Sequence, residues 1–195
     1  AGNYYTYGAV NAPPNSPFVY YGDSLQTGGF FAKHDQQGNL IWIKKLPGAF
    51  VYGTIGDQIT MDPAQNNIYL TGHFKVSIDP PGGGTLNPGP DGSVFILKYD
   101  VDGNFVYANK LNGVDFYDGE LTADYSGNLI FTSTFEDTIN VGSQTYISSG
   151  EYDVVMIKYG SSGSMQWSLQ SGGNNYEWVG ITSADENNNI YFAGE

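Results

Sequence analysis

The sequence contains no cysteine and little positive charge. Its 195 residues include 20 Asp and Glu but only 7 Lys and Arg, which gives a formal net charge of −13 at pH 7. Without cysteine the chain forms no disulfide. The excess negative charge repels phosphate backbones, so we expect no nucleic acid as a partner. No apolar run approaches the roughly 18 residues that a membrane helix needs, so we expect no insertion into a membrane.

Signals for helices are also scarce. Gly (27 residues), Tyr (16) and Phe (11) are abundant, whereas strong helix formers are few. The segment 78–92 contains four prolines and five glycines, a composition that excludes both a helix and a central strand. We therefore predict an all-β fold in which this segment is a surface loop.

What the sequence does contain is a long repeat. The string NNIYLTGHF at 66–74 recurs as GNLIFTSTF at 127–135 and as NNIYFAGE at 188–195, and a weaker copy, GNYYTYGAV, lies at 2–10. Other positions keep the same phase: the lysines that end short apolar runs and the aromatic residues nine positions later are Lys33, Lys98, Lys158, Trp42, Tyr107 and Trp167. A repeat of this length indicates units that bury their apolar faces by stacking on one another.

Each period predicts one small sheet. It contains four short segments of β-branched and aromatic residues separated by Gly, Asn, Asp and Ser, which is typical of a four-stranded antiparallel sheet. Repeated sheets of this kind most often form a β-propeller, in which each sheet is a blade and about four to eight blades close the ring. We expect a partial blade at 1–47, blades at 48–112 and 113–172, and the first two strands of another at 173–195.

These divisions make an incomplete arc of about three repeats. Both ends look cut, so we expect the chain to be a piece of a longer protein. The remaining blades would then come from the same chain or from another one.

The repeat resembles the SBBP repeat. The residues that carry the resemblance are Asn67, Tyr69, Gly72, Phe74, Lys98, Asp100, Gly103 and Asn104, with Trp42 and Trp167 at the tryptophan position. SBBP repeats form β-propellers in secreted and surface proteins of bacteria. The resemblance therefore implies a propeller and an extracellular or cell-surface location, but the family shares no single activity.

One turn carries candidate metal ligands. Asp100, Asp102 and Asn104 alternate as D-x-D-G-N, which resembles the first half of a calcium-binding loop. The glutamate that completes such a loop is missing, and Asp and Asn also favour turns for purely local reasons. A structural turn is the favoured interpretation and calcium is the alternative, and no other cofactor is expected.

The aromatic residues divide into two groups. The repeated ones, Trp42, Tyr107 and Trp167, are expected to pack between adjacent blades. A binding surface is expected where the copies differ, in the connections before a blade's first strand. The candidate ligand-binding residues there are Phe116, Tyr117, Tyr176 and Trp178. The repeated lysines are expected either to pair with Asp62, Asp124 or Asp185 or to extend into water.

No catalytic residue can be assigned from the sequence. His34 and His73 do not recur, no G-x-S-x-G motif is present, and cysteine nucleophiles are excluded. We therefore predict a non-catalytic binding, adhesion or scaffold module of a secreted or cell-surface protein, with a protein or a glycan at the cell surface as its partner. The alternative is the propeller domain of a glycan-active enzyme with paired carboxylates at the mouth of the channel.

Overall fold

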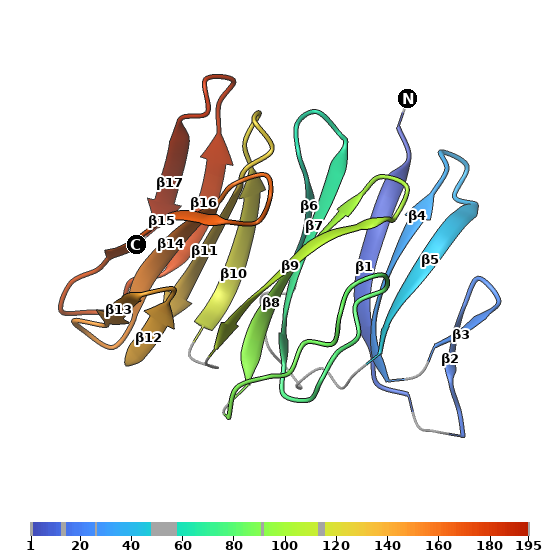
Figure 1. Ribbon diagram of the computed structural model, residues 1–195, viewed down its shortest axis with the longest axis horizontal. Helices are drawn as coiled ribbons and strands as arrows, with labels where there is room; N and C mark the ends of the chain where they lie inside the picture. The colour runs from blue at the N-terminus through green and yellow to red at the C-terminus, as the bar shows by residue number, and fades with distance from the viewer. Residues whose placement is uncertain are drawn as a thin grey trace.

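The computed structural model describes residues 2–12, 15–25, 27–47, 58–90, 92–112 and 116–194 (Figure 1). Within these ranges the chain forms strands and turns and no helix, which confirms the predicted all-β fold. No membrane-spanning helix occurs in the part of the chain that the structure describes.

The larger strands form four antiparallel sheets that lie in a row (Figure 1). The first sheet contains β1 (Tyr4–Val10), β4 (Gly28–His34) and β5 (Leu40–Pro47). The second contains β6 (Gln58–Met61), β7 (Asn67–Phe74), β8 (Ser93–Asp100) and β9 (Phe105–Asn112). The third contains β10 (Phe116–Ala123), β11 (Leu129–Phe135), β14 (Asp153–Tyr159) and β15 (Met165–Ser171). The fourth contains β16 (Val179–Ala184) and β17 (Ile190–Gly194).

Two small hairpins stand apart from this row. They are formed by β2 (Phe18–Tyr20) with β3 (Asp23–Leu25) and by β12 (Thr138–Val141) with β13 (Gln144–Ile147). Both lie at the lower end of the sheets in Figure 1, whereas the turns between β6 and β7 and between β10 and β11 lie at the upper end. The sheets are therefore blade-like, and they form an open row rather than a closed ring.

The pattern of burial explains where the strands carry apolar runs. Strand β8 (SVFILKYD) is buried at every position except its last, because neighbouring sheets cover both of its faces. The outer strand β15 (MQWSLQS) is only partly buried along its length. A strand that is covered on both faces needs an unbroken apolar sequence, whereas an edge strand does not.

The core lies between consecutive sheets. Phe31 of the first sheet packs in one buried cluster with Phe95 and Tyr99 of the second. A second cluster joins Tyr69 of the second sheet to Phe131 of the third. Burial of each such side chain contributes about 1.5–3 kcal/mol, so the sheets depend on their neighbours for stability.

The proline- and glycine-rich segment is a surface loop, as predicted, and two backbone hydrogen bonds close its base. The backbone N–H of Ile78 donates to the carbonyl of Leu86 at 3.0 Å, and the N–H of Leu86 donates back at 2.9 Å. The side chain of Ile78 is fully buried and belongs to the core between the first two sheets. Ile78 and the partly buried Leu86, which packs against the same core, hold the loop against the blade.

Candidate functional site

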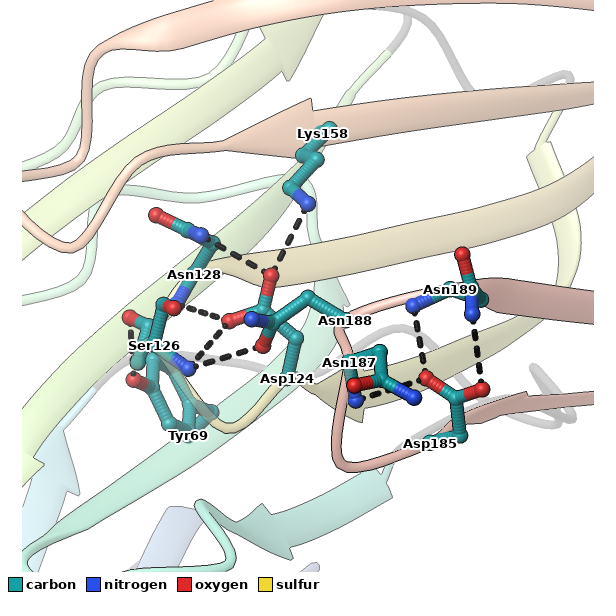
Figure 2. A network of polar contacts seen from close by, with 10 residues as sticks. Tyr69, Asp124, Ser126, Asn128, Lys158, Asp185, Asn187, Asn188 and Asn189 are labelled. Carbon is teal, nitrogen blue, oxygen red and sulfur yellow. Dashed lines mark hydrogen bonds and ion pairs between the residues drawn. The ribbon is translucent and has the colours of Figure 1, made fainter.

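Five turns share one arrangement of an aspartate and an asparagine. In the turn between β10 and β11, Asp124 Oδ1 accepts from the backbone N–H groups of Ser126 at 3.0 Å and Asn128 at 2.9 Å. Asp124 Oδ2 accepts from the side-chain amide of Asn128 at 2.8 Å (Figure 2). Closely similar contacts join Asp35 to Asn39, Asp62 to Asn67, Asp100 to Asn104, and Asp185 to Asn189. These repeated polar residues build turns by bonding to their own backbone.

The candidate calcium ligands lie in one of these turns. Asp100 Oδ1 accepts from the backbone N–H groups of Asp102 at 2.9 Å and Asn104 at 2.8 Å, and Oδ2 accepts from the Asn104 amide at 2.8 Å. Burial acts to raise the pKa of Asp100, but the hydrogen bonds from Asn104 and from the backbone of Asp102 and Gly103 together hold the pKa below its ordinary value. Among the described residues no three His, Asp or Glu side chains gather closely enough to hold a metal ion. Calcium binding at this turn stays a prediction.

Two of the repeated lysines join one sheet to the next. Lys33 Nζ donates to the carbonyl of Val101 at 2.8 Å, and Lys98 Nζ donates to the carbonyl of Ser161 at 2.9 Å. Both acceptors lie three residues after the next lysine of the repeat. The prediction of an acidic partner or of water is therefore wrong for these two lysines. Burial also lowers the pKa of Lys98.

The third lysine has the acidic partner that the sequence suggested. Lys158 Nζ lies 2.8 Å from Asp124 Oδ2 within the third sheet (Figure 2). The side chain of Asp124 is fully buried and that of Lys158 is 11% exposed. This ion pair joins strand β14 to the turn that precedes β11.

Further contacts join the second, third and fourth sheets. The hydroxyl of Tyr69 donates to the carbonyl of Gly127 at 3.1 Å. The backbone N–H of Ser126 donates to Asn188 Oδ1 at 3.0 Å (Figure 2). The turns at the upper end of the sheets therefore hold neighbouring sheets in register.

The opposite ends of the same strands carry a second set of contacts. His73 Nε2 donates to the carbonyl of Phe116 at 2.8 Å, where β10 begins. Thr134 occupies the same position one repeat later, and its hydroxyl accepts from the N–H of Val179, where β16 begins, at 3.1 Å. One repeat position thus fixes the start of the next sheet with two different side chains.

Two of the three repeated aromatics pack between sheets, as predicted. Trp42 lies against Gly103 of the next sheet, and Tyr107 lies against Gly163. Both glycines have positive φ, +81° and +88°, and a Cβ at Gly163 would lie within 3.0 Å of the Tyr107 ring. Glycine therefore satisfies both the backbone conformation and the close approach of the ring.

The four predicted ligand-binding residues have different surroundings. Phe116 is only 1% exposed and packs against Phe131, with 6.3 Å between ring centroids. The side chain of Tyr117 lies outside the described residues. Tyr176 and Trp178 are 50% and 39% exposed. Of the three whose side chains the structure describes, Tyr176 and Trp178 lie together on an open surface and Phe116 is buried.

A third ring, which the sequence analysis missed, completes that surface. The ring centroid of Tyr152 lies 5.5 Å from that of Tyr176 and 5.2 Å from that of Trp178. We call these three residues the aromatic platform. Tyr152 stands where the preceding copy of the repeat has Gly92, so a search for aromatics at non-repeating positions could have found it.

A short backbone ladder holds the aromatic platform together. The N–H of Glu177 donates to the carbonyl of Tyr152 at 3.1 Å, and the N–H of Glu151 donates to the carbonyl of Asn175 at 3.3 Å. At Gly150 any side chain would collide with the backbone of Asn175. The sequence thus uses a glycine to let the two connecting segments approach each other.

Acidic groups surround the aromatic platform. A hydrogen bond between the Tyr176 hydroxyl and Glu151 raises the pKa of the tyrosine, as does the nearby charge of Glu136. Glu177 Oε2 accepts from the N–H of Gly173 at 3.0 Å. Residues 111–195 contain 12 of the 20 acidic residues and one of the seven lysines. The platform therefore lies in the more negative half of the chain.

A cavity of about 340 Å³ lies between the first and second sheets. Its lining includes Tyr5, Lys33, Met61 and Val101. Lys33 already donates to Val101 there, and its ammonium lies 5.7 Å from the centroid of the Tyr5 ring. This cavity accompanies the contact between the sheets.

Comparison with known proteins supports a propeller-type repeat. No family model matches the chain. An uncharacterized WD repeat-containing protein of Acanthamoeba polyphaga mimivirus is 26% identical over 171 residues, a match that covers 71% of this chain and 12% of the relative. The chain thus spans a small part of the length of this relative. WD repeats are four-stranded blades of β-propellers, which agrees with the sheets seen here.

Proposed function

We propose that this chain is part of a non-catalytic binding and scaffold module that presents a surface to a partner protein. The contacts of the repeated polar residues support this proposal. Lys33 and Lys98 bond to the next sheet, and the repeated aspartates bond to their own turns. These residues hold the stack of sheets, which leaves the positions where the copies differ for a partner. Similarity to a WD repeat-containing protein agrees with this role.

The finer parts of the proposal follow from the SBBP resemblance. In this proposal the module is an SBBP-type propeller of a secreted or cell-surface protein, and a protein or glycan at the cell surface is its partner. Further blades from the same or another chain continue the row. Exposure of the last sheet supports this continuation, since Ile181 is 65% and Tyr191 58% exposed.

Affinity capture tests the proposed function. The folded chain is immobilised and incubated with surface proteins of the source cells, and bound proteins are identified by mass spectrometry. The heat-unfolded chain is the control. We expect a defined protein that binds the folded chain and not the unfolded control. Calorimetry with purified components should reproduce this binding. Release of reducing sugar from surface glycans by the chain, with no protein partner, would favour the glycan-active alternative.

A further inference from the structure

The aromatic platform has the chemistry of a cation-binding surface. Tyr152 is tilted by 37° from the ring of Tyr176 and by 36° from that of Trp178, so it contacts both rings and the three form one aromatic cluster. The faces of Trp and Tyr rings attract ammonium and guanidinium groups that lie within about 6 Å of the ring centroid. Trp178 and Tyr176 are the exposed members of the platform, at 39% and 50%.

The part of the chain that carries the platform contains few cations. Lys158 is the single basic residue of residues 111–195, and it is paired with buried Asp124 in the third sheet. Elsewhere in the chain, lysines do lie over tyrosine rings: Lys98 Nζ is 5.2 Å from the centroid of the Tyr69 ring. The aromatic platform offers the same kind of ring beside the carboxylates of Glu151 and Glu136.

The aromatic platform is preformed in the unbound chain. The ladder between Tyr152 and Glu177 and the close approach at Gly150 fix the two segments that carry the rings. The start of β16 is fixed in turn by the bond from Val179 to Thr134. Because little backbone ordering is required on binding, more of the interaction free energy remains for affinity.

We propose that the aromatic platform docks an arginine- or lysine-containing segment of a partner protein. A cationic side chain of the partner stacks on Trp178 or Tyr176, and Glu151 and Glu177 beside the rings complement its charge. Neutral sugars also stack on aromatic rings, but the negative charge of this half of the chain adds nothing to their binding. The inference rests on the proposed protein-binding function and names the partner's chemistry.

Peptide titration tests this inference on the full chain. The probes are acetyl-GRGRGRG-amide and the neutral acetyl-GQGQGQG-amide, and binding is followed by calorimetry in low salt. We expect the arginine peptide to bind and the glutamine peptide to bind at least about tenfold more weakly. The affinity for the arginine peptide should fall several-fold in 0.5 M salt, because screening weakens attraction between exposed charges.

Variants locate the binding site. We expect Trp178→Ala to weaken binding of the arginine peptide about fivefold to tenfold, the size typical of an exposed or partly desolvated cation–π contact. The double variant Glu151→Gln with Glu177→Gln removes charge while retaining side-chain shape. It therefore tests the same site even if Trp178→Ala disturbs folding. The matched control is Tyr125→Ala, an exposed tyrosine (48%) at the other end of the third sheet.

The outcomes separate this inference from the proposed function. Equal binding of the arginine peptide by Trp178→Ala, the double glutamine variant and Tyr125→Ala would overturn the docking site. Binding of a neutral oligosaccharide such as cellohexaose in preference to the peptide would also overturn it. A captured partner protein that binds Trp178→Ala as tightly as the unchanged chain would leave the proposed function standing and would refute the platform. If the peptide binds at the platform but no partner protein is captured, the docking site would stand and the proposed function would be refuted.

Discussion

The junction between the second and third sheets and the surface of the fourth sheet use the same repeated residues in different surroundings. Tyr69 and Tyr191 occupy the same position in the repeat. Tyr69 is fully buried, and its hydroxyl donates to Gly127 of the neighbouring sheet. Tyr191 is 58% exposed, and its hydroxyl donates to Asp185 of its own sheet at 3.0 Å. The repeat sets the position of the side chain, and the neighbouring sheet determines its burial.

The repeated aspartates show the same difference. Asp124 and Asp185 accept equivalent hydrogen bonds from Asn128 and Asn189 (Figure 2). Only Asp124 is fully buried and also pairs with Lys158. A residue type that recurs in every copy therefore contributes different amounts to stability, depending on what covers it.

The largest contrast is expected at the tyrosines. Tyr69→Ala should lower the free energy of unfolding by about 4 kcal/mol, because it removes a buried ring and leaves a cavity between sheets. Tyr191→Ala should have a much smaller effect, because its ring is mostly in water. Urea unfolding followed by circular dichroism measures both. Similar losses in the two variants would show that the fourth sheet is covered in solution.

A somewhat smaller contrast is expected at the aspartates. Asp124→Asn should cost about 3 kcal/mol, because it leaves the nearly buried ammonium of Lys158 without its charged partner. Asp185→Asn should cost less, since it breaks no ion pair among the described residues. Combining Asp124→Asn with Lys158→Met in a double-mutant cycle isolates the pair. Additive losses in that cycle would mean that the ion pair contributes nothing of its own.

Much of the fold could be predicted because it depends on local, repeated signals. Turn residues and alternating strands indicated an all-β chain, and the phase of Trp42 and Tyr107 indicated packing between sheets. Phe116 was harder, because it was expected in the connection before a blade's first strand, whereas β10 begins at Phe116 itself and carries that ring into the core. The length of a strand depends on its partner, here β11, and a single segment does not reveal it.

The candidate site was only half predictable for a related reason. Tyr176 and Trp178 stand out as aromatics at non-repeating positions, but Tyr152 joins them through a backbone pairing across 24 residues. The acceptors of Lys33 and Lys98 are backbone carbonyls, which every residue has. No residue type in the sequence marks such partners, so only the three-dimensional structure identifies them.

The smallest expected effect is a dependence of stability on pH. It distinguishes the two junctions that share one repeat position, at His73 and at Thr134. Burial lowers the pKa of His73 below its ordinary value of about 6.5, whereas Thr134 does not titrate. His73 donates through Nε2, and its Nδ1 is buried with no hydrogen-bond partner among the described residues. A second proton would therefore be buried without an acceptor. Below about pH 6.5 the unfolded chain binds this proton more readily than the folded chain does.

The contribution of His73 to stability should thus be fully present above about pH 6.5 and should decrease as the pH falls toward its folded-state pKa, by at most about 1.4 kcal/mol per pH unit. His73→Gln keeps a donor for the carbonyl of Phe116 and removes the titration. We therefore expect this variant to lose less stability between pH 7.5 and pH 5.5 than the unchanged chain does, as measured by urea unfolding at both pH values. Asp124 and Asp185 stay ionised in this range because their pKa values are lowered further below 3.8. Equal losses of stability in the unchanged chain and in His73→Gln would therefore mean that the junction tolerates a charged His73. The junction at His73 would then be no more sensitive to pH than the junction at Thr134.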